Sequence, residues 1–208
     1  INESGYNDIK AEIYFSLVQA YFKLKNTDAA MNYYGRLKSE FPDAAVVSRL
    51  KSFYNINDEL ETIKRAPDFD GILVDNPTKK FSNKDLKGKY YLLDFWSVGC
   101  AGCIVKMPQL HEVYEKYKSD RFEIVSVALN PSIQITRDFR SKRYPLPWIN
   151  IHPVGDIFSS QIAKDFKVNY LPRTFLVDPT GNIVASDGEL RSDQLEKTLN
   201  RYIKSSKN

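Results

Sequence analysis

Two cysteines, Cys100 and Cys103, stand three positions apart and are the only cysteines among the 208 residues of the chain. They follow the apolar, aromatic-rich segment Tyr90–Trp96, which is typical of a buried strand, and they begin a predicted helix over about residues 101–118. The orphan N–H groups and the dipole at a helix N-terminus stabilise a thiolate, which is the reactive form of cysteine. At this spacing one sulfur can attack a substrate disulfide and the other can resolve the mixed disulfide. The pair therefore predicts a redox-active dithiol.

Other uses of the two cysteines are less well supported. A zinc site needs two more ligands, and the only histidines, His111 and His152, form no ligand pair in the sequence. A purely structural disulfide over so short a loop removes little entropy from the unfolded chain and stabilises little. The net charge of +4 comes from 30 basic and 26 acidic residues, and these form no basic stripe, so we expect no nucleic-acid partner. No apolar run approaches the ~18 residues that a membrane span needs.

The elements that must position the dithiol lie in residues 66–208. Predicted strands are Ile72–Val74, Lys80–Ser82, Tyr90–Trp96, Phe122–Leu129, Arg173–Val177 and Asn182–Ser186. Predicted helices cover about 101–118, 132–143, 156–167 and 192–205. The residues Asp178-Pro179-Thr180-Gly181 predict the turn of a hairpin. This order of strands and helices predicts an α/β domain with a mixed central sheet.

Residues 1–65 predict a separate, all-helical unit. Apolar residues recur every three or four positions from about residue 9, and further helices are predicted over about 28–40 and 44–64. The segment resembles one tetratricopeptide repeat in Tyr14, Leu17, Ala20, Tyr21, Ala30, Tyr33, Tyr34 and Pro42. One such repeat cannot cover its own apolar face. The unit is therefore either an appendage packed on the main domain or on a second chain, or a docking surface for a partner.

The second unit resembles a known family. The run Asp94-Phe95-Trp96, then Cys100-Ala101-Gly102-Cys103, then Pro108, is similar to the active-site strand and helix of thioredoxins. Residues 171–176 (LPRTFL) are similar to the thioredoxin cis-proline segment, and the surrounding motifs resemble bacterial extracytoplasmic oxidoreductases of the TlpA/ResA type. The resemblance implies a thioredoxin-like fold over residues 66–208.

The resemblance also implies a role for each matched residue. Cys100 is expected to attack the substrate disulfide and Cys103 to resolve the mixed disulfide. Asp94 is expected to lie buried behind them and to accept a proton from Cys103, since burial makes a carboxylate a better proton acceptor. Pro172 is expected to be cis and to face both sulfurs, which leaves the preceding backbone free to pair with an extended substrate. The expected substrate-binding residues are Trp96, Gly99, Ala101, Gly102, Leu171 and Pro172. No metal and no cofactor beyond the dithiol is expected.

Two positions depart from the family pattern. Gly99 stands where the family usually has Trp, which opens the rim around Cys100. Lys106 stands where the extracytoplasmic branch often has an acid. We expect Lys106 to be exposed to solvent. If it points inward instead, its charge favours the thiolate and raises the reduction potential.

The leading hypothesis is a protein thiol–disulfide oxidoreductase, whose role as reductant, oxidant or isomerase the residues leave open. Its partners are expected to be protein thiols and disulfides and an upstream redox partner. One alternative is a peroxiredoxin-like peroxidase, but Ser97 stands where that class needs Thr. Another is a helical binding protein with an inactive thioredoxin-like domain. The resemblance implies an extracytoplasmic location, in the bacterial periplasm or at the cell surface, with anchoring through a segment absent from this chain.

Overall fold

The computed structural model describes residues 3–24, 26–54, 64–155, 159–168, 170–190 and 192–204. The chain forms two compact units, Ile1–Thr62 and Ile63–Asn208. The sequence predicts the border between the two units after residue 65.

The first unit contains three described helices, α1 (Glu3–Lys23), α2 (Thr27–Glu40) and α3 (Ala45–Tyr54). Asn26 caps α2, because its side-chain oxygen accepts a hydrogen bond from the Ala29 N–H at 3.0 Å. The centre of the unit is apolar, and Val18, Leu37 and Leu50 have no exposed surface. The third helix was predicted to continue to about residue 64, but α3 ends at Tyr54, and residues 55–63 lie outside the described part of the chain.

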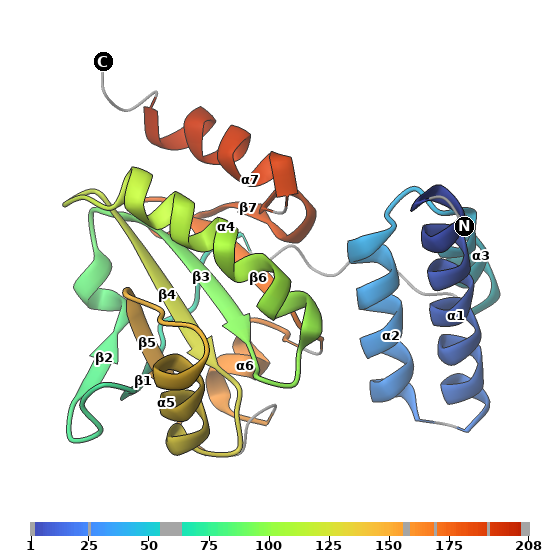
Figure 1. Ribbon diagram of the computed structural model, residues 1–208, viewed down its shortest axis with the longest axis horizontal. Coiled ribbons are helices and arrows are strands. Elements are labelled where there is room, and N and C mark those ends of the chain that lie inside the picture. Colours follow the sequence, from blue (N-terminus) through green and yellow to red (C-terminus); the bar gives the residue numbers. More distant parts are fainter. Residues whose placement is uncertain are drawn as a thin grey trace. The chain divides into compact units, whose positions relative to one another are not determined.

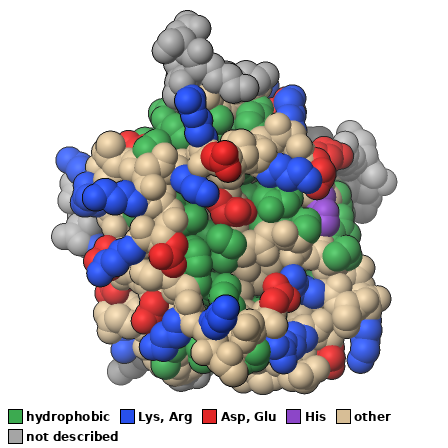
Figure 2. All heavy atoms as spheres, turned by 90° about the vertical axis from the view of Figure 1, so that its left-hand side faces the viewer, with side chains coloured by type: hydrophobic (Ala, Val, Ile, Leu, Met, Phe, Trp, Pro, Cys, Tyr) green, Lys and Arg blue, Asp and Glu red, His purple; other side chains and the backbone are tan. Residues whose placement is uncertain are grey.

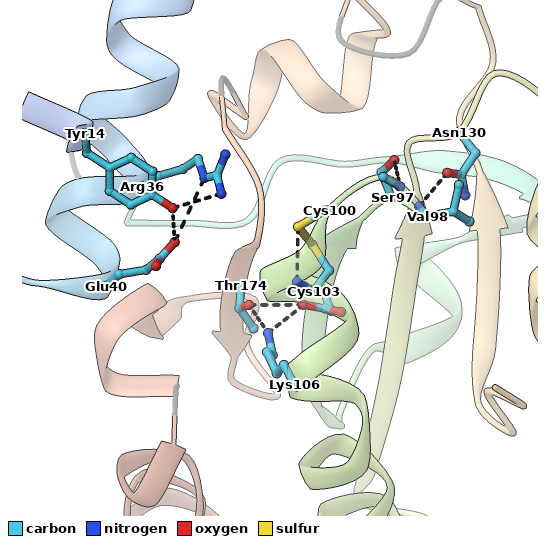
Figure 3. The surroundings of a disulfide bond; sticks show 12 residues. Tyr14, Arg36, Glu40, Ser97, Val98, Cys100, Cys103, Lys106, Asn130 and Thr174 are labelled. Carbon is cyan, nitrogen blue, oxygen red and sulfur yellow. Dashed lines mark hydrogen bonds and ion pairs between the residues drawn. A yellow bond between two sulfur atoms is a disulfide. The ribbon is translucent and has the colours of Figure 1, made fainter. Parts of the chain in front are cut away.

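A polar network joins α1 to α2 within this unit. The Tyr14 hydroxyl donates to Glu40 at 3.0 Å and accepts from Arg36 at 2.9 Å, as Figure 3 shows. Burial and the nearby Glu40 carboxylate raise the pKa of Tyr14 to about 12. The network stabilises the pairing of α1 with α2. Thiol–disulfide chemistry requires none of its three side chains.

The second unit is built on one seven-stranded sheet (Figure 1). Its strands are β1 (Asp70–Leu73), β2 (Lys80–Ser82), β3 (Tyr90–Trp96), β4 (Phe122–Ala128), β5 (Ile149–His152), β6 (Arg173–Val177) and β7 (Ile183–Ser186). The strand order is β2-β1-β5-β4-β3-β6-β7, in which β3, β4 and β5 are parallel and the other neighbours are antiparallel. The thioredoxin-like fold and the mixed sheet are thus as expected. The strand β5 is not among the strands predicted from the sequence.

The described helices of this unit connect and cover the strands. They are α4 (Ala101–Tyr117), α5 (Ile133–Lys142), α6 (Gln161–Asp165) and α7 (Ser192–Leu199), with a π-helical turn over Asn200–Lys204 and 3₁₀ turns over Asn83–Leu86 and Asp187–Leu190. The helix predicted over 156–167 is shorter than expected, and residues 156–158 lie outside the described part. The helices α4 and α7 lie side by side (Figure 1), and Lys116 of α4 forms an ion pair with Glu196 of α7.

The central strand β3 sends alternate side chains to opposite faces of the sheet. Asp94 points toward α4, where its carboxylate contacts Lys106. Phe95 points to the other face, where its ring lies 5.5 Å from that of Phe166 and 6.2 Å from that of Phe175. The dithiol helix α4 therefore covers the face that carries the buried acid, and an aromatic cluster fills the other.

The surface in Figure 2 carries acidic and basic side chains side by side, and neither sign gathers into a patch there. Among the described residues, no helix is both long enough and apolar enough to cross a membrane.

Candidate active site

Cys100 and Cys103 form a disulfide at the start of α4 (Figure 3), with their Cα atoms 5.2 Å apart. Cys100 is the N-cap of α4, and its sulfur accepts a hydrogen bond from the Cys103 N–H at 3.1 Å. The same N–H also donates to the Cys100 carbonyl oxygen at 3.0 Å. It can hold the negative charge of a thiolate in the reduced protein. Cys100 is partly exposed, whereas Cys103 is only 3% exposed. Of the two cysteines, Cys100 is therefore the more accessible to solvent.

The loop before Cys100 is fixed by a buried side chain from a neighbouring strand end. Asn130, just after β4, accepts a hydrogen bond from the Val98 N–H at 2.9 Å (Figure 3). Its own backbone oxygen lies 2.8 Å from Nε2 of His152, and Asn130 has no exposed surface. The Cys100 N–H donates to the Ser97 carbonyl oxygen at 3.0 Å, which tightens the turn. Asn130 is not among the site residues predicted from the sequence. Its position directly after a predicted buried strand is a signal for it, because the dithiol lies at the same edge of the sheet.

Pro172 lies against the segment between the cysteines. The Leu171–Pro172 peptide bond is cis. A Cβ atom placed on Gly102 would lie 3.4 Å from Cδ of Pro172, which is ordinary van der Waals contact. Next to the two cysteines, the residues Gly99, Ala101 and Gly102 are exposed, whereas Leu171 is only 9% exposed. These residues leave the rim around Cys100 low and open.

Lys106 is buried, so the expectation from the sequence that it is exposed to solvent is wrong. Its Nζ atom lies 2.7 Å from Oδ1 of Asp94. The same atom lies 2.5 Å from Oγ1 of Thr174 (Figure 3). The side chains of Lys106 and Asp94 are 7% and 6% exposed. Thr174 completes the triangle, since its hydroxyl donates to Asp94 at 3.1 Å. The buried acid behind the dithiol is therefore half of an ion pair.

The signals for this triangle were partly visible in the sequence. Lys106 follows Cys103 by three positions and precedes Leu110 by four, so all three lie on one helix face, and Cys103 and Leu110 are buried. Lys106 was nevertheless expected to be exposed, because lysine side chains usually are. Thr174 was missed because its contact with Asp94 depends on the antiparallel register of β3 and β6, in which the two residues are opposite each other.

Trp96 also differs from the expectation from the sequence, which placed it among the substrate-binding residues. Trp96 has no exposed surface, and its ring lies 5.3 Å from that of Phe139 on α5. It is the last residue of β3, a strand buried along almost its whole length, so its ring belongs to the core. Any effect of Trp96 on substrates is indirect.

The two histidines have local partners in the structure. Nε2 of His111 lies 2.5 Å from the Pro145 carbonyl oxygen, and the ring is 5.0 Å from that of Trp148. His152 contacts the backbone oxygens of Asn130 and Pro153. Within the described ranges, no three His, Cys, Asp or Glu residues are grouped so that they could hold a metal ion.

Comparisons with known proteins agree with this geometry. Residues 88–183 match a family described as thioredoxin-like. A thiol-disulfide oxidoreductase ResA of Bacillus cereus is 30% identical over 154 residues, which cover 74% of this chain and 83% of the relative. A second ResA, from another Bacillus cereus strain, is 32% identical over 152 residues, which cover 73% of this chain and 84% of that protein.

Solved structures show the same fold. The thioredoxin domain of a thiol-disulfide oxidoreductase from Bacteroides vulgatus is 29% identical, with a TM-score of 0.58 over 67% of this chain and 96% of that one. A thiol:disulfide interchange protein from a Bacteroides species is also 29% identical, with a TM-score of 0.60 over 71% of this chain and 93% of that one.

Proposed function

Because the chain belongs to the ResA family of thioredoxin-like thiol–disulfide oxidoreductases, we propose that it exchanges electrons with protein disulfides through Cys100 and Cys103. The observation that carries this proposal is the unequal burial of the two cysteines at one helix N-terminus. Cys100 is reachable and accepts a helix N–H, whereas Cys103 is 3% exposed behind it.

The reaction takes two steps. In the reduced protein, the Cys100 thiolate attacks one sulfur of a substrate disulfide, forms a mixed disulfide, and releases the other substrate sulfur as a thiolate. Cys103 then loses its proton and attacks the Cys100 sulfur, which releases the second substrate thiolate and forms the Cys100–Cys103 disulfide. Two electrons pass to the substrate, and the reverse sequence oxidises a substrate dithiol.

Asp94 is proposed to receive the proton of Cys103 in the second step. Its carboxylate lies under α4, the helix that carries both sulfurs. Lys106 holds the same carboxylate, so proton uptake by Asp94 changes a neutral ion pair into a buried positive charge. Because the Asp94 carboxylate neutralises its charge, Lys106 is not proposed to act on the dithiol as a free cation. We propose instead that it holds the Asp94 carboxylate in place under α4.

Pro172 and the backbone of Leu171 are proposed to bind the substrate chain. The contact of Pro172 with the Gly102 position puts this segment beside the dithiol. An extended substrate segment can pair with the strand edge just before β6, and backbone pairing of this kind does not depend on substrate sequence. Gly99 and Ala101 are proposed to line the open rim.

The proposed partners are proteins with accessible disulfides or dithiols, together with an upstream protein that resets the Cys100–Cys103 couple. No further cofactor is proposed. An extracytoplasmic location, in the periplasm or at the cell surface, is proposed from the ResA relatives, and anchoring through a segment outside this chain is part of that proposal.

Insulin reduction by dithiothreitol tests the proposed function. The wild-type protein is expected to accelerate insulin precipitation, and Cys100→Ser is expected to be no faster than dithiothreitol alone. Equal acceleration by both proteins contradicts the proposal. Fast peroxide consumption that survives Cys103→Ser would support a peroxidase instead.

A further inference from the structure

Asp187 lies at the end of β7 and receives hydrogen bonds from both sides of Pro172. Its Oδ1 accepts from the Thr174 N–H at 3.2 Å, and its Oδ2 accepts from the Tyr170 hydroxyl at 3.3 Å. Arg173 forms an ion pair with the same Oδ2. One carboxylate therefore holds residues 170, 173 and 174, which enclose the Leu171–Pro172 bond.

The side chain of Arg173 has several partners besides Asp187. Its side chain is 8% exposed, and that of Asp187 is 17% exposed. The guanidinium lies 5.3 Å from the ring centre of Tyr170 and 4.8 Å from that of Phe175. The guanidinium also donates to the Tyr170 hydroxyl at 2.7 Å. A shielded charge pair fixes geometry better than an exposed one, because water does not compete for the charged atoms.

The backbone of Asp187 is unusual in a way that suits this contact. Its φ angle is +44°, in the left-handed region that few residues other than glycine occupy. Aspartate tolerates this region better than most residues. The chain turns there from β7 into the 3₁₀ turn Asp187–Leu190, and the carboxylate meets the segment before β6.

Thr174 links this cluster to the dithiol helix. Its N–H is bound to Asp187, while its hydroxyl donates to Asp94 and accepts from Lys106 of α4. The carboxylates of Asp94 and Asp187 therefore both bind Thr174, which lies two positions after Pro172. A shift of the segment at Asp187 must move Pro172 relative to α4 or break the buried triangle.

We propose that Asp187 is a positioning residue for protein substrates. Its carboxylate holds the Tyr170–Thr174 segment so that the Leu171 backbone and Pro172 form a fixed edge beside the sulfurs, to which an extended substrate chain binds. The proposal rests on the proposed function of Cys100 and Cys103. A protein disulfide uses that edge, whereas a small disulfide needs only the Cys100 sulfur. Loss of Asp187 therefore slows the first reaction selectively.

The test compares two oxidants of the pre-reduced protein, insulin and hydroxyethyl disulfide. Samples are quenched in acid and alkylated, and mass spectrometry then measures the fraction of protein whose dithiol is oxidised. The time course gives second-order rate constants for oxidation of the dithiol. In Asp187→Ala the rate with insulin is expected to fall about 10- to 100-fold, the range for misplaced binding groups. The rate with hydroxyethyl disulfide is expected to stay within about twofold of wild type.

Asp178→Ala is the matched control, because Asp178 is a carboxylate at the other end of the β6–β7 hairpin. It accepts hydrogen bonds from Thr180 and Asn182, including the Asn182 N–H at 2.8 Å. Burial alone would raise the pKa of Asp178, but these hydrogen bonds outweigh burial and lower it. This variant removes a comparable structural carboxylate without touching the Pro172 segment. Its ratio of the two rates is expected to match wild type.

Asp187→Asn is the second variant, in case the alanine protein does not fold. It keeps an acceptor for the Thr174 N–H but loses the ion pair with Arg173, so a smaller selective loss is expected. Equal loss with both oxidants, or an unchanged ratio in the variants that fold, overturns the inference. A wild-type protein that reduces neither substrate refutes the proposed function instead.

Discussion

The ion pair between Lys106 and Asp94 makes a strong prediction about stability. Replacing Lys106 by Met keeps most of the length of the side chain but leaves the Asp94 carboxylate without its cation. Both side chains are less than 10% exposed, and the charged atoms are 2.7 Å apart. Water cannot easily replace the ammonium at this depth.

The size of the effect follows from the distance and the burial. At 2.7 Å and an effective dielectric constant of about 20, Coulomb attraction is about 6 kcal/mol before desolvation is subtracted. Removing one partner of a buried pair costs about 3–5 kcal/mol of the free energy of unfolding, and we expect Lys106→Met to fall in this range. Asp94→Asn with Lys106→Met removes both charges and keeps an amide oxygen for the Thr174 hydroxyl. The double variant is therefore expected to recover at least about 2 kcal/mol relative to the sum of the single changes.

The chain contains a control pair at the surface with the same shortest distance between nitrogen and oxygen. Lys118 Nζ also lies 2.7 Å from a carboxylate oxygen, that of Glu115, but the two side chains are 49% and 63% exposed. Solvent screens this pair, so Lys118→Met is expected to cost at most about 1 kcal/mol. The comparison separates the effect of burial from that of distance.

Urea unfolding of the oxidised proteins, followed by tryptophan fluorescence, measures these free energies. Trp96 and Trp148, the only tryptophans, both belong to the unit Ile63–Asn208, so the signal reports on the unit that holds the pair. A cost for Lys106→Met no larger than that for Lys118→Met would refute the reasoning. So would strict additivity of the Asp94 and Lys106 substitutions.

Three further outcomes are expected from other contacts. The hydrogen bonds that lower the pKa of Asp178 stabilise the fold above about pH 4 and lose this effect as the pH falls. The stability deficit of Asp178→Ala in urea titrations should therefore shrink from pH 7 to pH 3, and a deficit independent of pH contradicts this. Gly102→Ala should keep insulin reduction, because the added Cβ lies 3.4 Å from Pro172, whereas the branched side chain of Gly102→Val should slow it up to about 100-fold. Equal rates for these two variants would show that Pro172 does not limit this position. Asn130→Ala leaves the Val98 N–H without its acceptor and should cost about 1–3 kcal/mol in urea unfolding, and a cost below about 0.5 kcal/mol would argue against that anchor.

The sequence predicted the framework of the second unit well, since its strongest signals are local. Tyr90–Trp96 and Arg173–Val177 are strands with the predicted bounds, because each is a short, mostly apolar segment rich in aromatic or β-branched residues. The strand Ile149–His152 was missed because four residues between two prolines give little periodicity. Its place in the sheet comes from long-range pairing with β1 and β4.

Within the site, the sequence located the dithiol but not its charge environment. The spacing of Cys100 and Cys103 is a local signal, and the structure places both at the predicted helix start. The partners of Lys106 come from β3 and β6, which are 12 and 68 positions away in the chain. Contacts of this kind depend on register and on tertiary packing, which a single sequence does not encode in any local pattern. Asp187 was missed for the same reason.

Trapping of a mixed disulfide tests the central claim most directly. Pre-reduced Cys103→Ser should form a lasting covalent adduct with insulin through Cys100, since no second thiol remains to resolve it. Cys100→Ser should form little adduct, because Cys103 is 3% exposed. Intact mass measurement reads both outcomes. An adduct with Cys100→Ser but not with Cys103→Ser, or with neither variant, would contradict the account.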